Sequence, residues 1–382
     1  MRALVLAAVV LAASPFSAAA EAPQPLRFGV GLAATTPAVS RGVLPVLREI
    51  EKVADHRVKF DIYGGGSVVT LAGTVRGIRD GVVDGGFVGL SYVSSYLPRT
   101  SMVSQMVAFA SDSYAAAGAL HEFILAQCPE CVAELKRENL VLLLGGSGAP
   151  SVIFCRPETA ALQDLRGRAA GVVNATMARW AKSLGMTAEI LSPADFAPAL
   201  ERGRIDCALA PMSWFRAFGL VGAVHTVVEP ARGVIVGAMP ITLSHEAWGR
   251  FSAAERQRII DLMPGAAFDF AQRGFLLPDA AVRKSATDGP ARLKFLDESA
   301  DLTPRWTAWR ETERAALIAL ATRRGIADAQ PFVDRMIAVF DAWDRLTPPE
   351  GWSRESFSTT LKARAFDVAA GPVFGLGAPN PP

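Results

Sequence analysis

The segment from Asp164 to Pro230 constrains the fold more than any other part of the chain. Short apolar runs alternate with helical runs, and the pattern predicts strands at Arg168–Val173, Thr187–Leu191 and Ile205–Ala210 with helices at Ala175–Leu184 and Pro193–Arg202. Gly185 and Gly203 stand where each helix should end, and Ser192 is expected to cap the second helix. Connections this short favour parallel strands joined by right-handed crossovers. The segment therefore predicts an α/β layer, whose ligands bind beyond the carboxyl ends of its strands.

The same alternation precedes and follows this segment. Strands are expected at Leu26–Leu32, Arg57–Tyr63, Val82–Val88, Leu140–Gly145, Ser151–Cys155 and Gly233–Leu243, and helices at Ala38–Ala54, Leu71–Arg79, Ser113–Ala126, Val132–Asn139, Ala253–Met263, Phe268–Phe275 and about Pro304–Leu346. The glycine-rich GGSGAP at 145–150 would separate two strands as a hinge.

A single core rarely grows past about 250–300 residues, and the chain has 382. We therefore expect an α/β fold of two lobes, each a mostly parallel sheet flanked by helices. Lobe I would comprise 21–146 plus 233–275, and lobe II would comprise 147–232 plus 276–346. The Pro- and Gly-rich tail, 347–382, is expected to be irregular.

The N-terminus has the pattern of a secretory signal peptide. One arginine precedes an apolar run from Ala3 to Ala13, and small residues follow up to Ala20. The run is too short to span a bilayer, which takes about 20 residues. The pattern predicts cleavage near Ala20 and a soluble, periplasmic mature protein.

Charge and motif content exclude several functional classes. The 39 lysines and arginines are dispersed among 37 acidic residues, so no basic stripe predicts a nucleic-acid partner. The four histidines lie at 56, 121, 225 and 245, without the spacing of a metal site. No Gly-x-Ser-x-Gly elbow is present. We expect no enzyme activity, no metal and no cofactor.

The four cysteines allow several interpretations in an oxidising compartment. Cys128 and Cys131 are spaced for a local disulfide, for two free thiols or for a redox pair. Cys155 and Cys207 lie in apolar, strand-like runs and are expected to be buried as small hydrophobic residues.

Several segments together resemble the periplasmic solute-binding proteins of TRAP (tripartite ATP-independent periplasmic) transporters. DLRGRAAGVVN with the later LGM resembles the family's DLKGLKIR strand, helix and LGA turn, and SPADFAPALERGRIDCALAP resembles its ALQ-G-VDG segment. VRGIRDGVVDGGFVGLSYV and VIVGAMPITLSHEAWGRFSAAERQRI resemble two further family segments. The resemblance covers roughly 26–346 and implies two lobes that close on a small organic acid, which a membrane permease then receives.

The resemblance carries further expectations. It implies a long helix across both lobes, assigned here to Pro304–Leu346. Some relatives dimerise through C-terminal helices, so both a monomer and a homodimer are compatible with it. The family's carboxylate-binding arginine, however, aligns with Gly171, and the VDG glycine aligns with Cys207. Arg168 would point to the opposite strand face. The cleft is therefore expected either to be more apolar or to use Arg156, Arg179 or Arg168 instead.

Candidate ligand contacts follow the ends of predicted strands. They are Thr35, Thr36, Ser91, Tyr92, Ser147, Arg168, Asn174, Trp214 and Phe215. Trp214 and Phe215 are equally compatible with core packing, Asn174 with a helix N-cap, and Ser147 with a hinge. Three functions remain open: a TRAP solute receptor, a receptor that presents its ligand to a sensor, and a periplasmic thiol-redox protein that uses Cys128 and Cys131.

Overall fold

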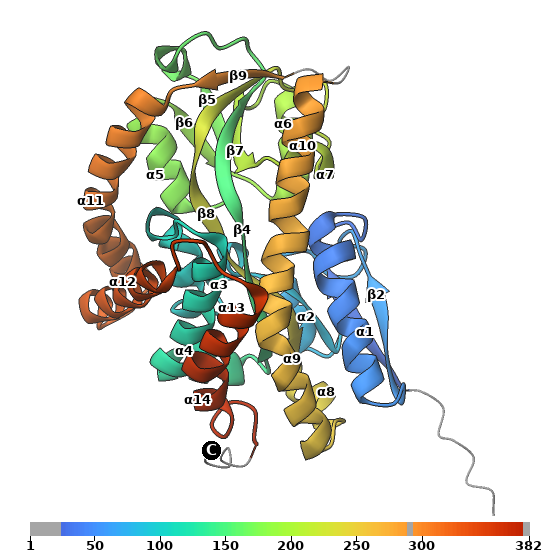
Figure 1. The fold of residues 1–382 in the computed structure, drawn as a ribbon. Coiled ribbons are helices and arrows are strands. Elements are labelled where there is room, and N and C mark those ends of the chain that lie inside the picture. The colour runs from blue at the N-terminus through green and yellow to red at the C-terminus, as the bar shows by residue number, and fades with distance from the viewer. Residues whose placement is uncertain (1–23, 289–292, 377–382) are drawn as a thin grey trace, which may run out of the picture.

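The computed structural model describes residues 24–288 and 293–376, so the predicted signal peptide lies outside the described residues. Within these ranges nine strands form one mixed sheet, in the order β2-β1-β3-β8-β4-β7-β5-β6 with β9 paired to β8. The sheet runs through two lobes that lie one above the other in Figure 1. This arrangement confirms the predicted two-lobed α/β class.

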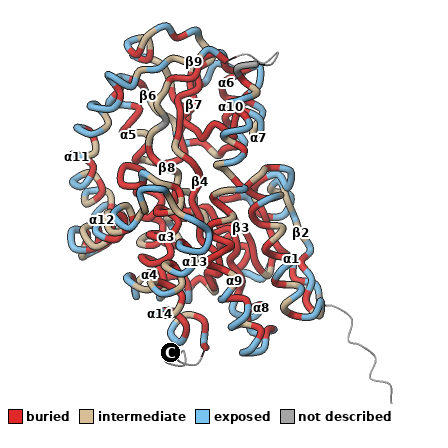
Figure 2. The backbone as a smooth tube through the Cα atoms, in the orientation of Figure 1, coloured by how far each residue is buried: buried red, intermediate tan, exposed pale blue. Residues whose placement is uncertain are grey.

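Lobe I is the lower half of the view and contains both ends of the described chain. Its own strands are β1 (Gln24–Val30), β2 (Val58–Tyr63) and β3 (Gly85–Gly89), and its helices include α1 (Leu44–Val53), α2 (Thr74–Arg79), α3 (Ser113–Glu122), α4 (Pro129–Arg137) and α8 (His245–Gly249). Strand β1 pairs in parallel with β2 and β3. Figure 2 shows that the buried backbone of this lobe gathers around α3, β3 and α9 (Ala253–Ala271).

Lobe II confirms the predicted β-α-β-α-β unit. Its elements are β5 (Ala169–Val172), α5 (Ala175–Ser183), β6 (Thr187–Ile190), α6 (Phe196–Glu201), β7 (Cys207–Pro211) and α7 (Trp214–Ala217). Strand β5 pairs in parallel with β6 and β7. Gly185 and Gly203 have positive φ angles of 81° and 67°, as expected of helix ends. Ser192 makes no side-chain capping bond, contrary to the expectation.

Two long strands connect the lobes. They are β4 (Val141–Cys155) and β8 (Thr226–Leu243), which pair antiparallel along their whole length. The predicted break at GGSGAP is therefore wrong, because the glycines lie inside one continuous strand. Their pairing register nevertheless shifts six times between Leu142 and Ile153, whereas β4 pairs with β7 without a shift. Such irregularities bend and twist a sheet locally, and they lie where one lobe passes into the other.

The helix that spans both lobes is not the predicted one. A continuous helical rod consists of α9 (Ala253–Ala271), the short wider turn η7 (Gln272–Leu276) and α10 (Leu277–Asp288), and it rises from lobe I along lobe II (Figure 1). Ser252 begins it with a reciprocal capping box to Glu255. Two separate helices were expected at Ala253–Met263 and Phe268–Phe275, yet α9 is continuous between them and contains Pro264. The predicted run Pro304–Leu346 forms two helices instead, α11 (Ser299–Arg323) and α12 (Ala329–Leu346).

The described part of the C-terminal tail, residues 347–376, is also ordered, contrary to the prediction. It contains α13 (Arg354–Leu361) and α14 (Asp367–Ala369), and Ser353 caps α13. Phe357 and Phe366 are buried against lobe I, the former beside Tyr114 and Phe268. Burial of these aromatic side chains outweighs the local preference of Pro and Gly for irregular structure. No helix of the described ranges has the length and apolarity needed to cross a membrane.

Candidate functional site: an apolar cavity between the lobes

A cavity lies between the lobes, beside the irregular part of the β4–β8 ladder. It holds about 740 Å³ of unfilled space, including the part that is open to solvent at its mouth. Both lobes and both crossing strands contribute walls, so a molecule inside would contact the two lobes at the same time.

The wall from lobe I follows strand ends. The loop after β1 supplies Leu32 and Thr36, and the residues after β3 supply Ser91 and Tyr92. Phe87 of β3 adds an aromatic face. The parallel pairing of β1 and β3 brings these ends together, because carboxyl ends of parallel strands meet at one sheet edge.

The wall from lobe II also follows strand ends. Val173 comes directly after β5, and Ser213 and Trp214 follow β7. Phe218 lies against Trp214 with ring centroids 4.8 Å apart, and Trp214 contacts Phe196 of α6 behind it. The tryptophan therefore belongs at once to the cavity wall and to the core of this lobe.

The floor is formed by glycines of the crossing strands and by the spanning helix. Gly237 has a φ of +100° and lies so close to Ser104 that an added Cβ would be 2.8 Å from the serine Cβ. Only glycine fits both constraints. A Cβ at Gly148 would lie 3.3 Å from the ring of Phe275, which enters the cavity lining from η7.

Tyr92 bridges the lobes at this cavity. Its hydroxyl, from lobe I, donates a hydrogen bond to the carbonyl of Leu191 in lobe II over 3.3 Å. Burial raises the pKa of Tyr92, so the hydroxyl stays protonated and can donate. The bond ties the two lobes together in the conformation seen here.

One carboxylate lies directly behind the lobe II wall. Asp279 of α10 accepts hydrogen bonds from the backbone N–H groups of Ser213 (2.6 Å) and Met212 (3.2 Å). Burial raises its pKa to about 6, although the side chain and N–H of Ser213, the N–H of Met212 and the charge of Arg283 act in the opposite direction. The Ser213 hydroxyl lies beside this carboxylate, 3% exposed, without a hydrogen-bond partner that meets normal geometry.

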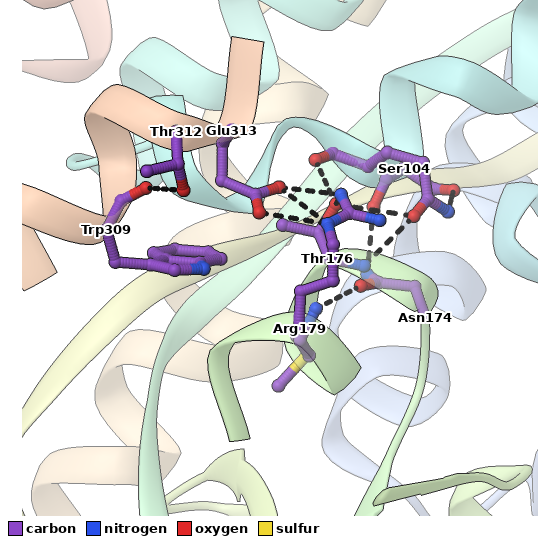
Figure 3. Close-up of polar contacts among 9 residues, drawn as sticks. Ser104, Asn174, Thr176, Arg179, Trp309, Thr312 and Glu313 are labelled. Atoms are coloured by element: carbon purple, nitrogen blue, oxygen red, sulfur yellow. Dashed lines mark hydrogen bonds and ion pairs between the residues drawn. The ribbon is translucent and has the colours of Figure 1, made fainter. Parts of the chain in front are cut away.

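A second, polar junction joins the lobes away from the cavity (Figure 3). The Asn174 amide donates to the carbonyl of Ser104, and the Thr176 hydroxyl donates to the carbonyl of Gln105, both over less than 3 Å. On the next helical turn, Arg179 forms a two-point ion pair with Glu313 of α11 at 2.6–3.0 Å. Glu313 is 1% exposed, so this charge is fully buried against its partner.

Four of the nine predicted ligand contacts line the cavity, and five do not. Those in the lining are Thr36, Ser91, Tyr92 and Trp214. Thr35 is exposed outside it. Phe215 stacks on Phe154 in the core, and the Ser147 hydroxyl donates to the carbonyl of Ser113. The Asn174 side chain caps α5 by accepting from the N–H of Met177.

The predicted substitutes for the family arginine also lie elsewhere. Arg168 donates to the Thr159 hydroxyl and to the carbonyl of Glu158, at the outer start of β5. Arg156 lies 3.9 Å from Asp206, and Arg179 is held by Glu313. At the aligned position, an added Cβ on Gly171 would lie 2.7 Å from Ile205, inside the packed core of lobe II.

All four cysteines are paired. Cys128 is bonded to Cys131, and Cys155 of β4 to Cys207 of β7, which corrects the expectation that the latter two are unpaired. Their strands lie side by side, and the two residues face each other in register. All four are 0% exposed, so Cys128 and Cys131 offer no accessible sulfur to a redox partner. No group of side chains in the described ranges is arranged to hold a metal ion.

The residues that the sequence did not reveal come from distant elements. Phe87, Phe218, Phe275 and Ile235 line the cavity, as does Gly148. Phe275 was placed in a predicted helix, and only the course of that helix past both lobes brings its ring to the cavity. A glycine pair, Gly237 in β8 and Gly274 beside Phe275, was the available signal of close backbone approach.

The sequence matches the model of a family described as bacterial extracellular solute-binding protein, family 7, over residues 30–273. No curated protein sequence gives a significant match. Among solved structures, a marine metagenome TRAP solute-binding protein specific for aromatic acids, in complex with metahydroxyphenylacetate, has a TM-score of 0.71 at 20% identity. The alignment covers 84% of this chain and 99% of that chain.

Two further structures are similar. A TRAP solute-binding protein from Rhodoferax ferrireducens in complex with benzoate has a TM-score of 0.74 at 16% identity, covering 85% of this chain and 99% of that one. A TRAP periplasmic protein from Bordetella bronchiseptica with bound mandelate has a TM-score of 0.69 at 20% identity, covering 84% and 99%.

Proposed function

The chain belongs to family 7 of the bacterial extracellular solute-binding proteins, the solute-binding proteins of TRAP transporters, and from this premise we propose that it is a periplasmic receptor. It captures one small organic ligand between its lobes and delivers it to the membrane subunits of a TRAP permease. Export removes the signal peptide near Ala20.

The observation that carries this proposal is a cavity walled by both lobes and closed by the bond from Tyr92 to Leu191. A ligand that contacts both walls binds the closed conformation more tightly than the open one, and this difference in affinity stabilises the closed conformation. Each of the three similar proteins has an aromatic acid bound in its solved structure. Small ring compounds are therefore the first ligands to test.

A ligand screen on the mature protein, from Glu21 onward, tests the proposal. Benzoate, mandelate and 3-hydroxyphenylacetate are compared with uncharged ring compounds and with amino acids. A ligand that binds only the native state raises the melting temperature by mass action. We expect at least one class of ring compound to do so, and small-angle X-ray scattering to show a smaller radius of gyration when it is bound.

A cavity-filling variant is the matched control. Ala217→Phe places a ring into the cavity from α7, where Ala217 lines the wall. We expect the variant to remain folded and to lose the ligand-induced shift. A wild-type protein that responds to no compound of the screen, or a variant that responds equally, contradicts the receptor function of this cavity.

A further inference from the structure

The cavity walls are apolar and uncharged. Apart from a few hydroxyl groups, the lining side chains within the described residues are aliphatic, aromatic or glycine, and none is Asp, Glu, Lys, Arg or His. Five carry aromatic rings, namely Phe87, Tyr92, Trp214, Phe218 and Phe275. Rings of this kind pack best against another flat, apolar group.

An organic anion in this cavity would lack a cationic partner. The arginines proposed as replacements, Arg156, Arg168 and Arg179, are bonded to other groups outside the lining. Arg216 of α7, the nearest cation along the chain to Trp214, is exposed and donates to Ser285. A carboxylate transferred from water to an apolar site without a partner is strongly disfavoured.

The two backbone N–H groups that begin the turn into α7 offer no anion site either. The N–H groups of Met212 and Ser213, which begin the turn into α7, are already occupied by the carboxylate of Asp279. A second negative charge next to this wall would be repelled, and the repulsion is strong where water is excluded. The carboxylate of Asp279 thus occupies the two N–H groups that a ligand carboxylate would need.

The hydroxyl groups supply what an uncharged polar group needs. The buried Ser213 hydroxyl lies beside the Asp279 carboxylate and, like the Tyr92 oxygen that donates to Leu191, keeps acceptor capacity. Ser91 adds a third hydroxyl. A ligand N–H or O–H group that reaches these oxygens gains a hydrogen bond in an otherwise apolar site.

We propose that this receptor takes an uncharged ring compound with one or two hydrogen-bonding groups, such as an aromatic carboxamide, alcohol or ester, and discriminates against the corresponding carboxylate. The ring lies among the five aromatic side chains, and the polar group meets the hydroxyls of Ser213 and Tyr92. This inference rests on the proposed receptor function and specifies its ligand class.

Matched pairs of nearly identical shape test the inference. Isothermal titration calorimetry at pH 7.5 on the mature protein compares benzamide with benzoate, phenylacetamide with phenylacetate, and cinnamamide with cinnamate. We expect the amide of at least one pair to bind at least tenfold more tightly than its carboxylate. Lowering the pH to 5 should improve the apparent binding of the carboxylate more than that of the amide, because more of the ligand is then the neutral acid and Asp279, whose pKa is raised to about 6, is then protonated as well.

Two variants place the effect at this cavity. Val173→Lys introduces a cation at the end of β5, and Val173→Met is its uncharged control of similar length. The lysine variant should shift the carboxylate-to-amide affinity ratio at least tenfold toward the carboxylate, whereas the methionine variant should not. Ser213→Ala should weaken amide binding about threefold to tenfold. Melting curves of each variant show whether it is folded.

The outcomes separate the two proposals. The ligand class is overturned if the carboxylate binds to the wild-type protein as tightly as its amide and the Val173→Lys variant shows no change in the affinity ratio. That result leaves the receptor function standing. Binding of neither member of any pair, to protein that melts cooperatively, overturns the receptor function of the cavity and the ligand class together.

Discussion

Two regions join the lobes, and they do so by opposite means. The cavity is walled by apolar groups with a few hydroxyls, and the hydrogen bond from Tyr92 to Leu191 joins the two lobes beside it. The junction around α5 is polar, and its buried groups are matched, with Asn174, Thr176 and Arg179 each bonded to a group on a neighbouring segment.

This difference in bonding indicates that the polar junction is permanent, whereas the contacts across the cavity are completed by a ligand. A buried ion pair such as Arg179–Glu313 leaves no group free, because each charge already has a two-point partner. The Tyr92 hydroxyl at the cavity, in contrast, keeps acceptor capacity while it donates to Leu191. We infer that the polar junction fixes the fold of the lobe boundary, whereas the cavity keeps its bonding capacity for a ligand.

The largest expected effect comes from breaking the polar junction. Arg179→Ala leaves the Glu313 carboxylate, 1% exposed, without its counter-charge. Removal of one partner from a buried pair typically costs about 3–5 kcal/mol. We expect the free energy of unfolding in urea to fall by about that amount. Arg314→Ala on the same helix removes an exposed pair with Asp334 and should cost less than about 1 kcal/mol. Equal losses would show that burial of the pair is unimportant.

The next effect separates cavity wall from core. Phe270 is 0% exposed and Phe275, one and a half turns later, is only half-buried in the cavity lining. Phe275→Ala should weaken ligand binding at least tenfold, about 1.4 kcal/mol, with a small change in melting temperature. Phe270→Ala should cost about 3–5 kcal/mol of stability. Calorimetric titration and thermal denaturation measure the two quantities, and a binding loss confined to the Phe270 variant would contradict the assignment.

Two buried titrating groups should respond to pH with opposite signs. Burial lowers the pKa of His121, in the core of lobe I, to about 4, so the unfolded chain takes up the proton first as pH falls below about 6.5. Stability is therefore present above that pH and is lost below it, by about 2 kcal/mol between pH 7 and pH 5.

Asp279 acts in the other direction. Its folded-state pKa of about 6 exceeds the ordinary carboxyl value, so the folded state binds the proton first and gains about 1 kcal/mol over the same range. Urea unfolding of His121→Gln and Asp279→Asn at pH 7 and pH 5 separates the terms. The Asp279 variant should lose stability more steeply than the wild type, and the His121 variant less steeply. The reverse order would refute both assignments.

The smallest effect concerns the bond across the cavity. Tyr92→Phe removes the hydroxyl that reaches Leu191 and keeps the ring. A hydrogen bond of this kind contributes about 1 kcal/mol, so ligand affinity should fall about fivefold. Tyr96→Phe, whose ring lies beside Arg79 in lobe I, is the control and should bind normally. Unchanged affinity of the Tyr92 variant would mean that the closed form does not depend on this bond.

Local signals in the sequence predicted β5, α5, β6 and β7 to within one or two residues and the start of α6 to within three, but they did not predict α7. Gly185 and Gly203 end their helices in the left-handed region, and Asn174 caps α5, since these residue types have strong preferences independent of the rest of the fold. The strand-end rule similarly placed Ser91, Tyr92 and Trp214 at the cavity.

Features that depend on distant contacts were not predictable. The glycines of GGSGAP indicated a break, but pairing on both sides of β4, with β8 and β7, extends the strand through them. Phe357 and Phe366 suggest little by themselves in a Pro- and Gly-rich tail, yet both are buried against lobe I. Phe275 becomes a cavity residue only because its helix passes both lobes.

The ordered tail has a consequence for the time order of folding. Lobe I begins with β1 at Gln24 and is completed by aromatic contacts from beyond residue 350, including Phe357 on Phe268 and Phe374 on Trp248. The β5–β7 unit of lobe II, in contrast, is contiguous in the chain. Since a chain is synthesised from its N-terminus, the lobe that starts first is finished last. A chain that ends before Phe357 would leave Phe268 and Trp248 of lobe I without these aromatic partners.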